Sequence, residues 1–410
     1  MDLFSATCRI VRTLKEAGHD TWIVGGSVRD RLLGVPVDEI EEFDVATAAH
    51  PAQVEATFER THAAGKAFGV IRVGVGPHWL EVATFRTEEG YSDGRRPDKV
   101  EFATAEEDVH RRDFTVNGLL WNPDTDEIRD YVGGRADLDA RRIRAIGDAE
   151  ERIREDGLRL LRAVRFGAWH DFELEPATLD AVRHHRACLA NVSEERLRDE
   201  LLKMATRPSM RHGDAWRLLV ETGLAPILLQ VDPDAAQVAD DVRVIAALTH
   251  RGLASWLAAA TRRACPAGSP PAAWRSYAER LTQRLRLSTD EHRALADLLA
   301  DRARYRDLDP ARPVRLRLAA TRPDAARHED LLAAEGDAVR ILDILRANRE
   351  THGSERPIPL LDGRRLMAAG LKPGRGLGRA LRRLRVRQLS GALTTSEQAL
   401  TWLGLAASDD

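Results

Sequence analysis

The hydrophobic pattern changes near residue 150, and this change limits the possible folds more than any other feature of the sequence. Before it, four short runs rich in β-branched and aromatic residues are separated by turn residues, a pattern typical of strands. These runs are residues 21–25, 43–47, 69–75 and 79–85. Between the first two, VRDRLLG predicts a short helix that ends at Gly34. From about residue 151 onward, apolar residues recur at helical spacing and strand patterns nearly vanish.

The sequence therefore predicts an α+β chain, with a small mixed β-sheet and helices in its first part and helices alone in the rest. Pro and Gly cluster at 266–271, 306–313 and 352–359, which indicates breaks between helical units. We expect four parts: a head at 1–150, a helical neck at 151–210, a helical body at 211–350 and a helical tail at 351–410.

Composition excludes several classes of protein. No run of about 18 uncharged apolar residues exists, so no membrane-spanning helix is expected. The N-terminal segment has the pattern of an amphipathic helix and lacks the apolar stretch of a signal peptide. Cys8, Cys188 and Cys265 are too widely spaced for a disulfide framework or a zinc site. A cytoplasmic location is therefore expected.

Basic residues are unevenly distributed. The chain carries a net charge of −3, yet only five of its 62 basic residues are lysines. Arginine forms paired hydrogen bonds with phosphate, although a GC-rich genome produces the same bias. Residues 361–390 hold a local basic excess opposed only by Asp362, which suits a phosphate backbone; the alternative is a solvated arginine-rich helix. The candidates for contact there are Arg364, Arg365, Lys372, Arg379 and Arg382.

Two glycines follow the first predicted strand, in the segment VGGSVRD at 24–30. Gly25 and Gly26 let a ligand approach the backbone, and the next helix presents free N–H groups to an anion. Arg29 lies in the first turn of that helix, where it can bind phosphate. Many such turns are only tight connections, so the motif defines no site by itself.

An acid pair precedes or begins the second predicted strand. Residues i and i+2 of a strand face the same side, so the carboxylates of Glu42 and Asp44 are expected to point together. Like charges held close are costly unless a cation lies between them. Two carboxylates and a triphosphate can hold Mg²⁺, and Glu81 on another strand can complete the cluster. The alternative is an exposed acidic strand edge.

Six segments together resemble one family in their order and spacing. They are 25–30 (GGSVRD), 42–47 (EFDVAT), 110–118 (HRRDFTVNG), 130–138 (DYVGGRADL), 154–166 (REDGLRLLRAVRF) and 193–200 (SEERLRDE). Their combination resembles the nucleotidyltransferase superfamily and, within it, the bacterial class II tRNA nucleotidyltransferases, or CCA-adding enzymes. The stretch from 359 to 400 also resembles the tail of that family.

The resemblance implies addition of C and A from CTP and ATP to the 3′ end of tRNA, without a nucleic acid template. It implies Mg²⁺ at Glu42 and Asp44, catalysis by these two residues with Glu81, and RNA binding by the five tail residues. Nucleotide binding falls to Gly25, Gly26, Arg29, Arg112, Asp156, Arg159, Arg162 and Arg165. No protein partner and no covalent enzyme intermediate are implied.

Asp156 and Arg159 are expected to share a helix face, because they are three residues apart. A carboxylate accepts a hydrogen bond from the amino group of C or A, and a guanidinium donates to the neighbouring ring nitrogen. Uracil and guanine reverse this pattern and leave buried groups unpaired, at a cost of about 1–3 kcal/mol each. Arg162 and Arg165 follow at steps of three and can reach a triphosphate. Asp113 is expected to order the site rather than to bind metal.

The sequence departs from the family at the first metal position. Glu42 stands where the family has Asp, and the stretch VPVDEIEEF after Gly34 is about three residues longer than usual. Normal activity, slower activity and loss of metal-dependent chemistry are the three possible outcomes, since a shift of about 1 Å can cost about 10²-fold. We expect activity to be retained, because the base-selecting helix and the phosphate arginines are present.

Several related functions compete with CCA addition. Bacterial poly(A) polymerases share the head motifs, but residues 65–71 (GKAFGVI) resemble the CCA-adding version. Residues 86–98 resemble the loop that helps the family switch from C to A, which argues against an enzyme that adds only C. An enzyme that adds only the final A, and an RNA-binding relative with catalysis weakened by Glu42, stay open. His170-Asp171 lacks partners at metal spacing, so a metal phosphohydrolase is not expected.

Overall fold

The structure is a computed structural model that carries side chains. It describes residues 1–65, 69–89, 99–169, 171–207, 210–309, 311–322, 324–336, 339–352 and 357–405. Most of the predicted loop at 86–98, part of the segment at 65–71, and His170 lie outside the described residues. Within the described ranges, no helix combines the length and the apolar character needed to cross a membrane.

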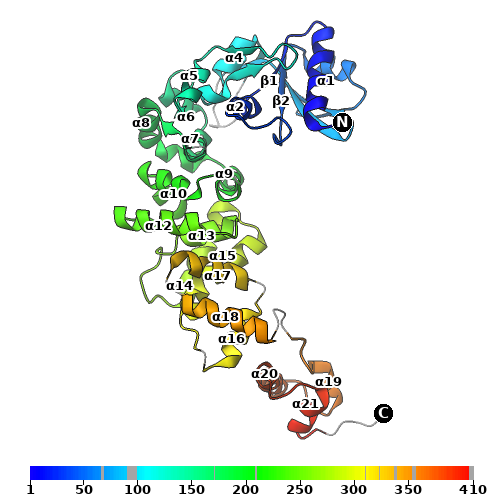
Figure 1. The fold of residues 1–410 in the computed structure, drawn as a ribbon, viewed down its shortest axis with the longest axis vertical. Helices are drawn as coiled ribbons and strands as arrows, with labels where there is room; N and C mark the ends of the chain where they lie inside the picture. Colours follow the sequence, from blue (N-terminus) through cyan, green and yellow to red (C-terminus); the bar gives the residue numbers. More distant parts are fainter. Residues whose placement is uncertain are drawn as a thin grey trace. The chain divides into compact units, whose positions relative to one another are not determined.

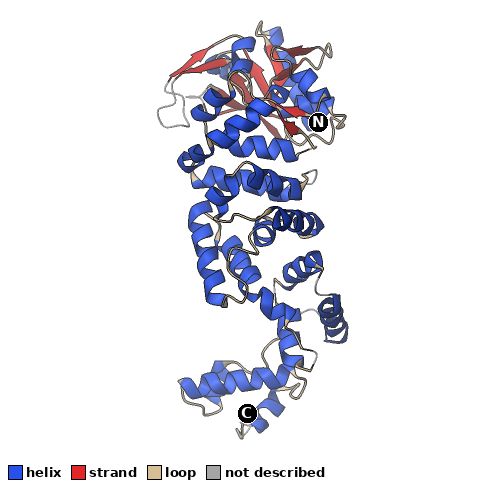
Figure 2. Ribbon diagram, turned by 90° about the vertical axis from the view of Figure 1, so that its left-hand side faces the viewer, coloured by secondary structure: helices blue, strands red, loops and turns tan. Residues whose placement is uncertain are grey.

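The chain forms two compact units. The first comprises Met1–Val242 with Arg284–Arg286, and the second comprises Arg243–Gln283 with Leu287–Asp410. The predicted division into four parts at 150, 210 and 350 stays a prediction. The change from a mixed to a helical structure near residue 150 is confirmed, and Figure 2 shows the large sheet confined to the part that contains the N-terminus.

The first unit is built on a seven-stranded mixed sheet with the order β3-β4-β5-β2-β1-β8-β9. Its strands are β1 (Thr21–Val24), β2 (Asp44–Thr47), β3 (Thr61–Gly65), β4 (Val70–Val75), β5 (His78–Thr84), β8 (Leu119–Trp121) and β9 (Ile128–Asp130). Among the described residues of this sheet, only β2 and β5 pair in parallel. The four predicted strands are β1, β2, β4 and β5, so these predictions are confirmed.

Helices cover the sheet, which explains why every residue of β1 is buried. Helices α1 (Leu3–Glu16) and α3 (Pro51–Thr57) contact its strands, and α4 (Ala105–His110) packs with Trp22 and Val24 of β1. The short helix α2 (Gly26–Leu32) follows β1 directly, as predicted from the sequence. Elsewhere in the head, the shorter elements are β6 (Arg86–Glu89), β7 (Lys99–Phe102), the 3-10 helix η2 (Thr115–Asn117), α5 (Gly134–Asp139) and β10 (Arg142–Ile143).

The rest of the first unit is mainly helical. Its elements are α6 (Ala149–Glu155), α7 (Leu158–Ala168), β11 (Glu173–Leu174), α8 (Pro176–His184), the 3-10 helix η3 (Arg186–Asn191), α9 (Glu194–Thr206), α10 (His212–Glu221) and α11 (Leu224–Leu229). Helix α7 is almost entirely buried and contacts both α9 and α10, with α6 and α8 beside it (Figure 1). Helix α7 therefore carries its side chains into the interior of this unit.

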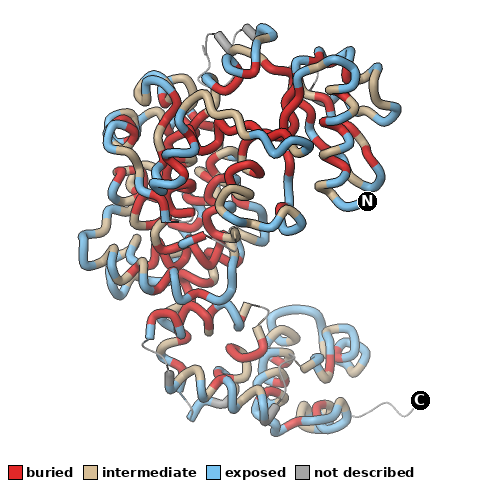
Figure 3. The backbone as a smooth tube through the Cα atoms, turned by 45° about the horizontal axis from the view of Figure 1, so that its top comes forward, coloured by how far each residue is buried: buried red, intermediate tan, exposed pale blue. Residues whose placement is uncertain are grey.

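The second unit consists of helices, and α12 (Ala235–Ala247) runs into it from the first. The others are α13 (Leu253–Ala260), α14 (Pro271–Leu285), α15 (Thr289–Arg306), α16 (Pro313–Ala320), α17 (Ala325–Glu335), α18 (Val339–His352), α19 (Gly363–Ala368), α20 (Arg375–Leu389) and α21 (Ser396–Trp402). The predicted breaks at 266–271 and 306–313 each end at the first residue of a helix, which confirms them, and half of the segment 352–359 lies outside the described residues. Figure 3 shows buried residues within both units.

Candidate active site

The Gly-Gly turn joins β1 to α2 and brings the backbone close to charged side chains. Gly25 has a φ of +77°, a left-handed value that favours glycine. A Cβ atom at this position would lie 3.6 Å from Nη1 of Arg112 and 3.7 Å from Oδ2 of Asp44. The turn therefore lies directly beside a predicted nucleotide-binding arginine and a predicted metal ligand.

A cavity of about 830 Å³ lies next to this turn, within the first unit. Its wall combines the Gly-Gly turn, the acidic segment before β2, the start of α7 and the end of α9. The residues are Gly25, Gly26, Ser27, Arg29, Asp30, Val35, Glu39, Ile40, Glu41, Glu42, Asp44, Arg112, Asp113, Asn117, Asp156, Arg159, Arg162, Arg165, Phe166, Trp169, Lys203 and Arg207. The structure thus brings together all the predicted head and neck site residues except Glu81.

The acid pair lines this cavity. Asp44 is the first residue of β2, and Glu42 precedes the strand rather than belonging to it. Both side chains are exposed and Phe43 between them is buried, so the predicted alternation is confirmed. The cavity walls reduce the hydration of Asp44, and this effect, followed by the charge of Glu42, raises its pKa to about 6; Glu81 adds to the rise, and Arg112 opposes it.

Glu81 does not complete a cluster of three acids. It pairs with Asp44 in the register of β2 and β5, but it is not part of the cavity wall. Within the described residues, no group of three or more His, Cys, Asp or Glu side chains is arranged to hold a metal ion. The expected three-acid cluster is therefore wrong, because neighbouring strands hold the third carboxylate outside the cavity; a catalytic role for Glu81 stays a prediction.

Two carboxylates nevertheless fit a divalent cation that also binds substrate. Magnesium usually takes one or two protein carboxylates together with substrate phosphates and water. The pKa of Asp44 is raised first by burial and next by the charge of Glu42, so a cation beside the pair would favour the charged form of its carboxylate. Glu42 and Asp44 therefore offer a suitable donor set, although Mg²⁺ itself stays a prediction.

Arg29 is held more firmly than the sequence suggested. Its side chain is buried, and it donates to Asp30 Oδ1 at 2.9 and 2.8 Å and to Asn117 Oδ1 at 2.7 Å. Its guanidinium also lies over the ring of Trp169, at 4.3 Å from the centroid. Contacts on several sides fix its orientation at the cavity wall, where the predicted phosphate contact stays a prediction.

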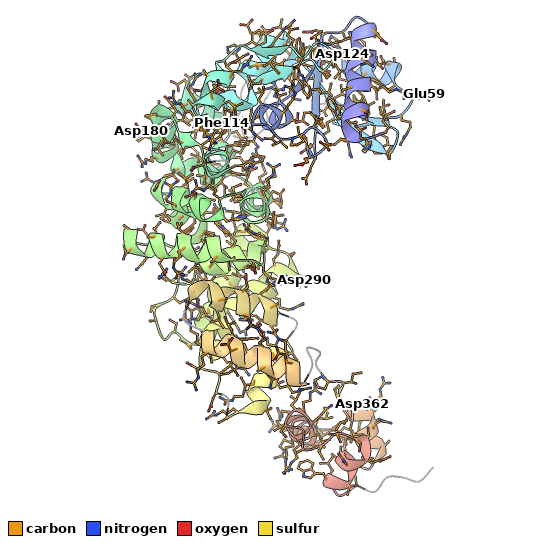
Figure 4. All side chains as sticks on the ribbon, in the orientation of Figure 1. Glu59, Phe114, Asp124, Asp180, Asp290 and Asp362 are labelled. Atoms are coloured by element: carbon orange, nitrogen blue, oxygen red, sulfur yellow. The ribbon has the colours of Figure 1, made fainter. Side chains whose placement is uncertain are left out.

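Asp113, which lines the cavity, orients Arg162. Its carboxylate accepts from Nε of Arg162 at 2.7 Å and from Nδ2 of Asn117 at 3.1 Å. Although burial acts to raise the pKa of Asp113, the Arg162 charge and these hydrogen bonds outweigh it and hold that pKa well below its usual range. The adjacent Phe114, labelled in Figure 4, is buried and meets Phe166 of α7 edge-on. Asp113 thus orders the site, as expected.

Arg165 and Arg112 of the wall are also paired with acids. Arg165 donates from Nε to Oε2 of the buried Glu200 on α9 at 2.6 Å. Arg112 lies 2.9 Å from Oδ2 of Asp108. Each pair lowers the energetic cost of placing a charge beside the cavity and fixes where its guanidinium points.

The expectation that Asp156 and Arg159 lie on one helix is wrong. Helix α6 ends at Glu155, Asp156 has extended φ and ψ of −143° and 103°, and α7 begins at Leu158. The Asp156 carboxylate accepts from the Leu158 N–H at 3.0 Å, so it caps α7 rather than continuing α6. Gly157 lies at this break and packs tightly: a Cβ atom at its position would lie 2.6 Å from the carbonyl oxygen of Cys188.

Asp156 and Arg159 nevertheless both line the cavity, and each is held by other partners. Arg196 of α9 binds Asp156 through two hydrogen bonds of 3.0 and 2.7 Å. Arg159 donates to Glu155 at 2.7 Å and to the carbonyl oxygens of Arg152 and Arg111. Because a carboxylate has four lone-pair positions, Asp156 can still accept a further hydrogen bond.

Sequence reasoning identified the segment 193–200 of α9 but missed Lys203 and Arg207, which line the wall. Lys203 follows Glu200 by three residues and shares its helix face, and Arg207 comes directly after the last residue of α9. This spacing of charged residues was visible in the sequence and could have revealed them. Trp169, in contrast, joins the wall through the fold of the chain after α7, and no sequence pattern marked it.

A second cavity, of about 770 Å³, lies within the second unit among residues of α15, α16 and α17. Its Arg322 is held by the carboxylates of Asp297, Asp301 and Asp324. None of the predicted site residues line it. The first cavity is therefore the candidate active site.

Comparisons with known proteins define the class first. Residues 21–144 match the family described as "Poly A polymerase head domain", and residues 171–237 match "Probable RNA and SrmB- binding site of polymerase A". The head with its Gly-Gly turn and acid pair is thus that of a nucleotidyltransferase.

Comparison with individual related proteins then identifies the family within this class. A CCA-adding enzyme from Levilactobacillus brevis is 32% identical over 406 residues, which cover 95% of each chain. One from Lactobacillus gasseri is 41% identical over 225 residues, and this match spans about half the length of that relative. The Bacillus stearothermophilus CCA-adding enzyme in complex with CTP is 28% identical, with a TM-score of 0.74 and 98% of each chain covered. The chain belongs to the family of CCA-adding enzymes.

Proposed function

We propose that this protein adds C and A from CTP and ATP to the 3′ end of tRNA without a nucleic acid template. The observation that carries the proposal is one cavity that joins the Gly-Gly turn and acid pair of the head to Asp156 and Arg159 of the neck. The first group suits nucleotidyl transfer, and the second suits recognition of a base. Kinship to the Levilactobacillus brevis CCA-adding enzyme along most of the chain supports this assignment.

Glu42 and Asp44 are the residues that would hold the divalent metal, which we propose to be Mg²⁺. When bound, such an ion supplies charge for the triphosphate and lowers the pKa of an attacking hydroxyl group. The reaction joins the tRNA 3′ oxygen to the α-phosphate of the nucleotide and releases pyrophosphate. The raised pKa of Asp44 supports the acid pair as the place where positive charge is most needed.

The paired arginines bind and orient the triphosphate. Arg29, Arg162 and Arg165 are each fixed by a carboxylate, so their remaining N–H groups point in set directions. Preorganised donors stabilise developing charge without reorganising during the reaction. Arg112, next to Gly25 and Asp44, is placed to contact the same group.

Asp156 and Arg159 select the base. Bidentate binding by Arg196 holds the Asp156 carboxylate in one orientation, with lone-pair capacity left for an amino group of C or A. Carbonyl oxygens and Glu155 hold Arg159 in the same way. The rigidity of both groups makes a base with the reversed pattern costly to accept.

The tail supplies RNA contacts in this proposal. Arg364, Arg365, Lys372, Arg379 and Arg382 are all exposed. Helices α19, α20 and α21 pack around Leu366, Leu384 and Ala399, which leaves the arginines outside this small core. An apolar core with a basic surface suits a phosphate backbone. The cytoplasm, where tRNA is processed, is the proposed location.

The test uses purified protein, Mg²⁺ and three tRNA transcripts that end at the discriminator base, at C and at CC. Each transcript receives labelled CTP, ATP or both, and the products are sized on a gel. Extension of all three to CCA is expected, and Asp44→Asn is expected to abolish it. Addition of A to the CC end alone, long A tails, or no incorporation by the wild type would each overturn the proposal.

A further inference from the structure

Arg207 differs from every other arginine of the active-site cavity. The carboxylates of Asp30, Asp108, Glu155, Asp113 and Glu200 lie within 3 Å of Arg29, Arg112, Arg159, Arg162 and Arg165, respectively. Arg207 also belongs to the wall, yet none of the described carboxylates lies within ion-pair distance of its guanidinium. Among these arginines, Arg207 is therefore the one whose positive charge has no carboxylate partner in the described part of the chain.

The Arg207 side chain is nevertheless held in place. It follows the last residue of α9, and its guanidinium lies over the ring of Trp169, at 3.9 Å from the centroid. Arg29, which follows the Gly-Gly turn, lies over the same ring at 4.3 Å. Two like charges that share one aromatic ring repel each other, and an anion between or beside them would relieve that repulsion.

The charged groups around Arg207 also favour a bound anion. Burial is the main cause that lowers the pKa of Arg29 and of Arg165, and the nearby charge of Arg207 lowers both further. The wall next to Arg207 includes Lys203, whose Nζ lies 3.3 Å from Oε1 of Glu200. The part of the wall that contains Arg207 and Lys203 therefore carries basic residues, whereas the part that contains Glu42 and Asp44 carries acids.

We propose that Arg207 binds the terminal phosphates of the incoming nucleoside triphosphate. The inference rests on the proposed function and adds to it a substrate-contacting residue outside the recognised motifs. The triphosphate is favoured over the RNA backbone because Arg207 shares Trp169 with Arg29, which joins it to the Gly-Gly turn. A triphosphate also brings more negative charge to one place than a single phosphodiester does.

Calorimetric titration of the full-length protein with CTP and with CMP, both in Mg²⁺, tests this inference. Arg207→Gln is expected to weaken CTP binding about tenfold, the loss of one charge-assisted hydrogen bond, and to leave CMP binding unchanged. Arg207→Lys, which keeps the charge, is expected to recover part of the CTP affinity. Arg217→Gln is the matched control, because Arg217 is a partly exposed arginine of α10 paired with Glu221 and lies outside the cavity wall.

Thermal unfolding of each variant shows whether it is folded, and tRNA affinity is measured in parallel. Unchanged CTP affinity in Arg207→Gln would overturn the proposal. If tRNA binding were weaker in that variant, Arg207 would contact RNA. If tRNA binding were also unchanged, Arg207 would serve only as the residue that ends α9. Equal losses for CTP and CMP would also overturn it. A failure of the proposed function can be distinguished from a failure of this inference, because a protein that incorporates no nucleotide can still bind CTP through Arg207.

Discussion

The active-site cavity and the tail both depend on arginine, but they use it in opposite ways. In the cavity, five arginines each lie within 3 Å of a carboxylate, and Arg29 and Arg165 are almost completely buried. In the tail, the five predicted RNA-binding residues are exposed. Their one acidic neighbour in the sequence, Asp362, labelled in Figure 4, caps α19 by accepting from the Arg365 N–H at 2.8 Å.

This difference shows what pairing with an acid achieves. A carboxylate partner fixes the direction of a guanidinium and offsets the free-energy cost of burying its charge. This arrangement suits a site that must hold its ligand in a single geometry. Unpaired exposed arginines add to a diffuse field that attracts phosphate in many orientations. The cavity should therefore be sensitive to single substitutions, and the tail should respond in proportion to the charge removed.

The largest expected effect comes from breaking a buried pair in the cavity. Arg165→Met leaves Glu200 buried with weaker compensation, and we expect it to lower the free energy of unfolding by about 3 kcal/mol. Urea denaturation followed by circular dichroism measures this loss. The double variant Arg165→Met/Glu200→Leu should recover most of it, because both charges are then removed.

The matched substitution in the tail is Arg382→Met. It should change the free energy of unfolding by less than about 0.5 kcal/mol, because its side chain is exposed and unpaired among the described residues. A similar loss of stability in both variants would contradict the contrast between cavity and tail.

A smaller effect is expected for RNA binding by the tail. The double variant Arg379→Gln/Arg382→Gln should weaken tRNA binding and reduce the slope of log affinity against log salt by about 1.4 to 1.8, since each lost phosphate contact contributes about 0.7 to 0.9. Filter binding across a salt series measures the slope. CTP affinity should not change, and Arg346→Gln, an exposed arginine of α18, should leave the slope as it is in the wild type.

The smallest effect concerns the pair of carboxylates, Glu42 and Asp44, that face each other in the cavity wall. The folded-state pKa of Asp44 is raised to about 6, so the folded protein holds this proton more tightly than the unfolded chain, and stability falls as pH rises through about 4 to 6. In EDTA at pH 8, Asp44→Asn should therefore raise Tm by about 2 °C or less, after allowance for solvent screening.

Thermal unfolding at several pH values checks this sign. The difference between Asp44→Asn and wild type should shrink as pH falls from 6 towards 4. Added Mg²⁺ should favour the wild type, because only the wild type keeps both carboxylates. A variant less stable than the wild type in EDTA at pH 8 would show that the acid pair carries no repulsion.

Much of the fold could be predicted from the sequence because strong local patterns determine it. The runs that form β1, β2, β4 and β5 are rich in β-branched residues, whereas β8 and β9 have three residues each and give almost no periodic signal. The break between α6 and α7 was missed for another reason. Helical spacing continues across it, and Gly157 at the break packs against the distant Cys188 carbonyl, a contact that no local pattern indicates.

The site could be predicted where its residues lie in recognisable motifs, such as Gly25, Asp44 and Arg162. Which acid holds which arginine could not be predicted, because pairs such as Arg162 with Asp113 join residues far apart in the chain. Local spacing even suggested the wrong partner for Asp156, which binds Arg196 instead of sharing a helix face with Arg159. Pairing of this kind depends on how α7 and α9 pack against each other.

The crowded position of Gly157 has a consequence for how this family member can change its nucleotide preference. Any side chain at 157 would push against the backbone of Cys188 and against Val192, which lie at the end of η3 and just after it. A displacement of that segment moves the start of α7, and with it the carboxylate of Asp156. If Asp156 selects the base as proposed, nucleotide choice is tied to a stretch of chain outside the residues that line the cavity. Altered selectivity should arise from substitutions there as well as at the base-contacting residues themselves.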